Sequence, residues 1–342
     1  MPGLRQRLRD FMYSLPPGQR NRLRLLARSW KLPFVGRGGI LLYHRVTDLA
    51  NDPWALAVPP VMFADHLAVL AERTTCLPLP EFLARRAAGT LPRNATALTF
   101  DDGYADNLLE ALPLLERHGL PATVFIMTGF VGGDREPWWD RLEQAVFATA
   151  ELPGAIALEV AGGKVAWTRP AGALGHAERH ALHLDLYEAV APLDTEPREA
   201  VLAELWRQLD ASPRLRPSHR PLTLDELRQL AAHELITIGA HTRSHPQLAQ
   251  ISSSRQRDEL ASSKATLEDW LGRPIDLVAY PHGSHDDTTC AVAAELGFQA
   301  GFTTQPRVVP HRSAPFRIPR INIEAQDTAS FSSLLRWYGV AG

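Results

Sequence analysis

The chain has 342 residues, of which 45% are hydrophobic and 22% are charged, and this composition supplies enough apolar material for a sizeable core. A formal net charge of −2 gives no overall field that would attract nucleic acid, so we expect no nucleic-acid partner. The two cysteines lie outside any CxxC pair, which argues against a disulfide framework and is compatible with a reducing compartment.

The first 37 residues form a basic stretch, in which nine Lys or Arg residues occur with a single acid, Asp10. Apolar residues recur there at roughly helical spacing, which predicts a basic helical extension over 1–37. Its helices would lie on an anionic membrane surface or pack on the main domain, and we favour packing because Pro16 and Pro17 keep each helix short. No apolar run has signal-peptide or membrane-spanning length, so we expect a cytoplasmic protein, with peripheral contact at the inner membrane as the alternative.

From residue 38 onward, apolar strand-like runs alternate with helical patterns. The expected strands are 40–44, 96–100, 122–127, 235–240, 275–280, 299–303 and 317–323, and the expected helices are 63–73, 105–118, 224–232, 255–271 and 287–296. This alternation predicts an α/β fold with a mainly parallel sheet covered by helices. We expect the barrel-like domain to span 38–325 and a C-terminal helix or tail to span 326–342.

Between residues 134 and 221 the alternation stops. The segment begins near Trp138 and Trp139, and it contains a hairpin pattern at 158–168 and helical patterns at 177–190 and 198–209. We interpret it as an α+β insertion between barrel elements, and the alternative is a small separate domain.

Polar side chains follow three of the predicted strands, at 101–102, 241–245 and 280–285, and these strand ends meet on one face of a parallel barrel. Asp101 and Asp102 come directly after one strand, although an isolated Asp-Asp-Gly is most often a plain surface turn. His241 and His245 follow another strand, and their i, i+4 spacing lets one local turn point both imidazoles at an ion. One carboxylate and two imidazoles are the usual ligands of an open metal site.

Three motifs in this order resemble those of the polysaccharide deacetylases with a NodB-homology domain (carbohydrate esterase family 4). They are TFDDGY at 99–104, HTRSHP at 241–246 and AYPHG at 279–283, after the opening ILLYHRV at 40–46. The resemblance covers about 38–323, apart from much of the insertion. It implies a distorted (β/α)7-type barrel that hydrolyses N-acetyl or O-acetyl groups on a saccharide, such as a bacterial exopolysaccharide or glycan precursor.

The resemblance also implies a role for each motif residue. Asp102, His241 and His245 would bind a divalent metal, most often Zn²⁺, with Co²⁺, Ni²⁺ or Mn²⁺ as alternatives. Asp101 would be the general base toward water. The backbone N–H of His282 would stabilise the oxyanion.

Further residues are candidate substrate contacts. Pro281 and Gly283 would shape the turn that carries the third motif, and Tyr104 and Tyr280 lie within the motifs. Aromatic rings near a polar site often stack on sugars, which makes Trp138 and Trp139 candidates as well. Packing of the insertion onto the barrel is an equally good interpretation of these two tryptophans.

Three departures from the family pattern leave roles open. Ala279 stands where the third motif usually carries an arginine that orients the base, and we expect Arg320 to supply that group or else to be a surface arginine. The Asp-Trp pair of the fourth motif is not recognisable, and the late motif that supplies a histidine as general acid is absent. His44, His282 and His285 remain as candidates for that acid.

Two other functions remain open beside the deacetylase. The missing motif residues also fit a non-catalytic carbohydrate-binding or assembly protein, and the metal motifs alone fit a hydrolase of small non-sugar amides. The sequence does not indicate an oligomeric state.

Overall fold

A computed structural model describes residues 38–160, 163–168, 174–310 and 314–341. The basic extension predicted over 1–37 lies outside the described residues. No helix within the described ranges is both long enough and apolar enough to span a bilayer.

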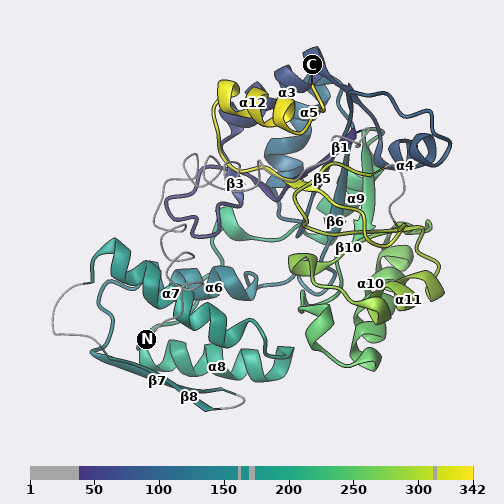
Figure 1. Ribbon diagram of the computed structural model, residues 1–342. Coiled ribbons are helices and arrows are strands. Elements are labelled where there is room, and N and C mark those ends of the chain that lie inside the picture. The colour runs from purple at the N-terminus through teal and green to yellow at the C-terminus, as the bar shows by residue number, and fades with distance from the viewer. Residues whose placement is uncertain (1–37, 161–162, 169–173, 311–313, 342) are drawn as a thin grey trace.

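The centre of the molecule is a parallel sheet that curls on itself (Figure 1). Its strands, in spatial order, are β11 (Ala300–Phe302), β10 (Leu277–Ala279), β9 (Ile236–Ala240), β6 (Ala122–Ile126), β5 (Ala95–Phe100), β1 (Gly38–Tyr43) and β12 (Ile321–Asn322). A short strand, β4 (Thr75–Cys76), pairs with the start of β5. Every pairing in this sheet is parallel, as the alternation of strands and helices predicts.

One C-terminal segment connects the two edges of the sheet. The amide of Ile318 donates to the carbonyl of Gly301 in β11, and Ile321 pairs with Leu41 of β1. The predicted distorted barrel is therefore confirmed, with its last strand reduced to two paired residues. The expected strand 317–323 is interrupted because Pro319 has no N–H to donate to a neighbouring strand.

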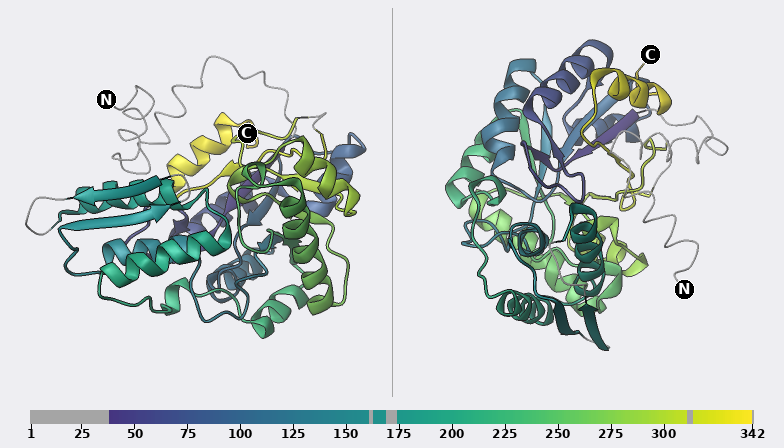
Figure 2. Two further views of the ribbon diagram at one scale, coloured as in Figure 1. Left: turned by 90° about the horizontal axis from the view of Figure 1, so that it is seen from below. Right: turned by 90° about the vertical axis from the view of Figure 1, so that its left-hand side faces the viewer.

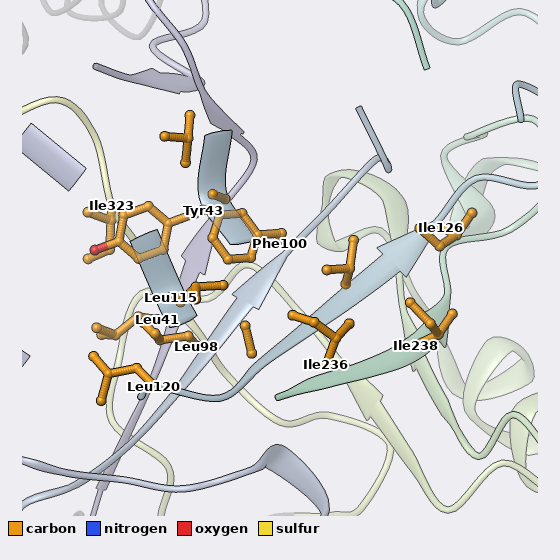
Figure 3. Packing of buried hydrophobic residues seen from close by; sticks show 14 of the residues in the cluster. Leu41, Tyr43, Leu98, Phe100, Leu115, Leu120, Ile126, Ile236, Ile238 and Ile323 are labelled. Atoms are coloured by element: carbon orange, nitrogen blue, oxygen red, sulfur yellow. The ribbon is translucent and has the colours of Figure 1, made fainter. Parts of the chain in front are cut away.

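Strand residues alternate between two apolar layers, because successive side chains of a strand point to opposite faces. On β1, Ile40 packs inside the barrel, whereas Leu41 packs in the cluster that extends to the surrounding helices. Figure 3 shows this second cluster, in which Leu98 lies beside Leu41 and Ile238 lies farther across the sheet. Each such fully buried aliphatic side chain contributes about 1.5–3 kcal/mol to stability.

Helices cover the outside of the curled sheet (Figures 1 and 2). They are α3 (Pro60–Arg73), α4 (Leu79–Ala87), α5 (Leu112–His118), α9 (Leu224–Ala232), α10 (Ser253–Leu271), α11 (Asp287–Glu295) and α12 (Thr328–Trp337). The helix predicted over 105–118 is wrong in its first half, where a π-helical turn covers Asn107–Ala111. Pro113 explains the irregularity, since it lacks the N–H of a regular α-helix and its ring displaces the preceding turn.

The insertion lies to one side of the barrel (Figures 1 and 2). It contains α6 (Trp138–Phe147), the antiparallel pair β7 (Ala155–Val160) and β8 (Gly163–Thr168), and the helices α7 (His176–Val190) and α8 (Thr195–Gln208). Leu142, Leu186 and Leu202 belong to a hydrophobic cluster separate from the barrel clusters. The insertion therefore has a core of its own.

Candidate active site

The adjacent aspartates lie at the carboxyl end of β5. The amide of Asp101 donates to the carbonyl of Tyr43 at 3.1 Å, which aligns the ends of β5 and β1. Asp102 then adopts φ +77° and Gly103 φ +78°. A non-glycine residue in this left-handed region is uncommon, and Asp tolerates it better than most residues. The sharp turn separates the two carboxylates, so that Asp101 pairs with Arg320 and Asp102 lies between the two imidazoles.

Two imidazoles follow the carboxyl end of β9, which is separated from β5 by β6. The amide of His241, directly after β9, donates to the carbonyl of Ile126 at 2.9 Å. Its Nδ1 lies 2.8 Å from the carbonyl oxygen of Ala279, so Nδ1 carries the proton and Nε2 offers its lone pair. The chain then turns through Thr242, whose Oγ1 accepts from the amide of His245 at 3.1 Å.

Asp102, His241 and His245 converge on one point. Oδ1 of Asp102 lies 3.5 Å from Nε2 of His241 and 3.5 Å from Nε2 of His245. The three side chains are buried, and their possible ligand atoms lie within 4.8 Å of one another. Among the described residues, Oδ1 of Asp102 is buried without a hydrogen bond, which is costly for an anionic oxygen unless a cation satisfies it. The donor set and this orphaned oxygen both fit a divalent metal with an open position.

The two imidazoles differ in their electrostatic surroundings. Burial lowers the pKa of His245, and the neighbouring His282 lowers it further. Burial also acts to lower the pKa of His241, but the charges of Asp101 and Asp102 outweigh it and raise that pKa.

Asp101 is held by Arg320, which is fully buried. Both guanidinium Nη atoms donate to the carboxylate at 2.7 Å, one to each oxygen, and Nε donates to the carbonyl of Thr303 at 3.1 Å. Burial would raise the pKa of Asp101, but the charges of Arg320 and His241 outweigh it, so this pKa lies below its ordinary value. Arg320 is therefore a buried partner of Asp101 and not a surface arginine, and the backbone carbonyl of Ala279 accepts from His241.

The third motif forms a tight turn beside the metal-ligand candidates. His282 has φ +57° and Gly283 φ +68°, and a Cβ on Gly283 would lie 2.3 Å from Oγ1 of Thr304. The amide of Gly283 donates to the carbonyl of Tyr280 at 2.8 Å. The ring of His282 lies 4.5 Å from the ring of His245, so this turn borders the site.

The three candidate acids occupy different places. His44, directly after β1, is partly buried and lies close enough to Asp101 and Asp102 for their charges to act on its pKa, which burial lowers. His282 is more exposed and borders the site. His285 is turned away, because its ring stacks on Tyr280 and its Nδ1 lies 2.8 Å from the carbonyl of Gly283.

The four predicted aromatic substrate contacts are all buried, with exposed fractions between 0% and 4%. Tyr280 points to the outer core and away from the site, so its predicted contact with substrate is not supported. Trp138 packs in the core of the insertion, where its ring stacks on Tyr187. For Trp138 the packing interpretation is therefore the better one.

Tyr104 and Trp139 form a buried junction between the barrel and the insertion. Nε1 of Trp139 donates to the hydroxyl of Tyr104 at 2.8 Å, and this hydroxyl donates to Oδ2 of Asp140 at 2.7 Å. The indole of Trp139 lies 4.5 Å from the ring of His245, so it supports that imidazole. Desolvation raises the pKa of Asp140 to about 7, and no pattern in the sequence singled this carboxylate out.

A family model described as polysaccharide deacetylase matches residues 88–151 and 211–301. The unmatched stretch 152–210 falls within the predicted insertion. Among curated proteins, the putative polysaccharide deacetylase YxkH of Bacillus subtilis is 21% identical over 286 residues, which cover 83% of this chain and 70% of YxkH. The poly-beta-1,6-N-acetyl-D-glucosamine N-deacetylase of Staphylococcus aureus is 22% identical over 263 residues, which cover 77% of this chain and 65% of that protein.

Solved structures with the same fold include the Streptococcus pyogenes deacetylase PplD in complex with acetate. It is 20% identical with a TM-score of 0.57, and the match covers 88% of this chain and 98% of that one. IcaB from Ammonifex degensii is 18% identical with a TM-score of 0.56, and the match covers 89% of this chain and 97% of that one. These likenesses concern the fold.

Proposed function

We propose that this chain, as a member of the polysaccharide deacetylase family, hydrolyses carbon–nitrogen bonds other than peptide bonds and removes N-acetyl groups from a saccharide in a metal-dependent reaction. The observation that carries the proposal is the convergence of Asp102, His241 and His245 beside Asp101, which Arg320 holds in place. Hydrolysis adds water across the amide bond and releases acetate and a free amine.

The metal would be held by Oδ1 of Asp102 and by Nε2 of His241 and His245. We expect Zn²⁺, with Co²⁺, Ni²⁺ or Mn²⁺ as alternatives, because two imidazoles and one carboxylate suit these ions. When bound, such an ion supplies Lewis acidity that favours deprotonation of water and polarises a carbonyl.

Asp101 would accept the proton of the attacking water. A carboxylate with a low pKa is ionised at neutral pH and is therefore ready to accept a proton. The two parallel N–H···O bonds from Arg320 fix the plane of the carboxylate and keep its charge compensated. The backbone N–H of His282 is our candidate donor to the oxyanion, and Pro281 and Gly283 keep the turn that presents it.

His44 is the candidate acid that we favour for returning a proton to the leaving amine. It follows β1, which lies directly beside β5, and the charges of both aspartates reach its imidazole. His282 is the second candidate, since its ring also borders the site. His285 is turned away by its stacking on Tyr280.

An exopolysaccharide or glycan precursor rich in N-acetylglucosamine is the substrate class that we propose. The support is the S. aureus relative, whose name specifies poly-beta-1,6-N-acetyl-D-glucosamine. We place the protein in the cytoplasm, with peripheral membrane contact through its basic first 37 residues as a further proposal.

The test measures metal content and acetate release from N-acetylglucosamine oligomers. We expect Asp101→Asn to keep its metal and to lose about 10²–10⁴-fold in kcat, as the loss of a general base does. Asp102→Ala should lose the metal. His44→Gln should lower kcat far more than His285→Gln does. Asp134→Asn, which makes the same change at an exposed carboxylate, should leave both readouts unchanged.

Other results would point to other functions. If the metal-loaded wild type released no acetate from any saccharide but hydrolysed small amides, the substrate class would be wrong. If it bound saccharides without hydrolysing them, the chain would be a carbohydrate-binding protein on this fold. Full metal occupancy in Asp102→Ala would refute the proposed ligand set.

A further inference from the structure

The turn that joins the two histidines is held in an unfavourable backbone conformation. Thr242 has φ +62° and His245 φ +58°, and neither residue is glycine. Such backbone angles persist only where the surroundings impose them. The spacing of the two Nε2 atoms therefore depends on what holds this turn.

The loop after β6 holds one side of the turn. The amide of Thr128 donates to the carbonyl of Thr242 at 3.2 Å, and the amide of Gly129 donates to the carbonyl of Arg243 at 2.9 Å. A Cβ on Gly129 would lie 2.5 Å from that carbonyl oxygen, so the close approach requires glycine.

A single carboxylate holds the other side. Glu259 of α10 is fully buried, and its Oε2 accepts from the amides of Arg243 and Ser244, each at 2.9 Å. Its Oε1 accepts from Oγ of Ser244 at 2.7 Å. The guanidinium groups of Arg243 and Arg255 lie 3.6 and 3.8 Å from Oε1 and offset the buried charge.

We propose that Glu259 is a positioning residue for the metal site. Its carboxylate binds two of the three backbone amides between the ligands and so fixes the arrangement in which His241 and His245 converge on Asp102. Glu259 does not contact the converging atoms and acts through the turn. The inference rests on the metal-binding part of the proposed function.

The test is a titration of the metal-free, full-length protein with Zn²⁺ and Co²⁺. We expect Glu259→Ala to raise the metal Kd at least tenfold and to change the visible spectrum of bound Co²⁺, because substitutions of groups that support metal ligands typically weaken binding 10–100-fold. Glu259→Gln should stay within about threefold of the wild type, because its amide oxygen still accepts from both backbone amides.

Gln256→Ala is the matched control for general destabilisation. Gln256 lies one turn earlier on the same helix, is equally buried, and accepts a hydrogen bond from Thr289 Oγ1 at 2.7 Å rather than bonding the ligand turn. It should lower the melting temperature and leave the metal Kd and the Co²⁺ spectrum unchanged.

Several outcomes would overturn the inference. One is a wild-type Kd and spectrum in Glu259→Ala, and another is an equal loss of affinity in Gln256→Ala. If Glu259→Ala does not fold, Glu259→Asp is measured instead. Its shorter side chain moves the carboxylate away from the two backbone amides and should weaken metal binding about tenfold. An unchanged Kd in Glu259→Asp would then refute the inference. A wild type that binds no metal would instead refute the metal-binding part of the proposed function.

Discussion

Asp101 and Arg320 lie 219 residues apart in the sequence and form a bidentate ion pair that has almost no exposure to solvent. The desolvation of such a pair is expensive, and its attraction offsets that cost only when the geometry is good and the remaining donors are satisfied. Here Nε of Arg320 is also bonded, to the carbonyl of Thr303. The pair therefore holds the proposed base in one orientation.

We predict that Arg320→Lys lowers kcat by about 100-fold while metal content stays near that of the wild type. Lysine keeps the charge but offers a point-like ammonium group, so the carboxylate loses its planar two-bonded partner. The measurement is steady-state acetate release together with metal analysis. Arg317→Lys, at a partly exposed arginine, is the control and should be neutral. Equal activity in the two variants would contradict the prediction.

At the residue scale, the motifs in the sequence predicted which side chains meet. Asp102, His241 and His245 follow strand ends, and parallel strands bring such ends together. Glu259 could not be predicted, because a glutamate on a polar helix most often faces solvent and only the tertiary structure places it under the turn. The burial of Tyr280 was missed for the same reason, since its position in the motif does not give the direction of its ring.

At the scale of elements, the insertion carries an unusual buried histidine. His183 of α7 is fully buried against Trp54 and Phe147, and among the described residues neither of its ring nitrogens has a hydrogen-bond partner. Burial lowers its pKa to about 3, so the ring is neutral in the folded state.

We predict that the insertion loses stability in mild acid. Because the folded pKa of His183 lies below the unfolded value of about 6.5, the unfolded chain binds more protons between about pH 6.5 and pH 3. Stability contributed by this residue is therefore complete above about pH 6.5 and falls by about 2 kcal/mol at pH 5. His183→Leu should flatten the dependence of the melting temperature on pH, as measured by calorimetry. A slope as steep as that of the wild type would refute this role.

Most elements were predictable because their apolar patterns are strong. The helix over 224–232 was predicted, and the structure has the same bounds, with a capping box formed by Thr223 and Glu226. The failures occurred at prolines within apolar patterns. Pro113 and Pro319 each remove a backbone donor, which periodicity alone does not register.

At the scale of the whole molecule, the barrel and the insertion keep separate cores and meet at the buried hydrogen bonds of Tyr104, Trp139 and Asp140. The barrel brings the proposed catalytic groups together, and the insertion supports one of them through the indole of Trp139. The barrel could be predicted from the alternation of strands and helices in the sequence. The way the insertion packs on the barrel could not be predicted, because a periodic pattern within one segment carries no information about contacts between two cores.

The membrane-surface alternative for the basic N-terminal stretch, as opposed to the packing on the main domain that we favour, predicts binding to anionic membranes. Replacing Arg20, Arg22 and Arg24 by glutamine should weaken binding to anionic vesicles about 100-fold, since each basic residue near such a surface contributes about 1 kcal/mol. Sedimentation with anionic and neutral vesicles measures the effect. The control makes the same change at three exposed arginines elsewhere, Arg135, Arg207 and Arg257. Equal binding by both variants would contradict the prediction.

The segment that joins the two edges of the sheet is also the last part of the barrel to be synthesised. A ribosome makes about 5–20 residues per second, and folding begins before the chain is finished. The proposed metal ligands and Asp101 emerge long before Arg320. Arg320 lies in the closing segment, between Ile318, which bonds to β11, and Ile321, which pairs with β1. During translation Asp101 therefore lacks the positive charge of Arg320. The proposed base is oriented only when the barrel closes.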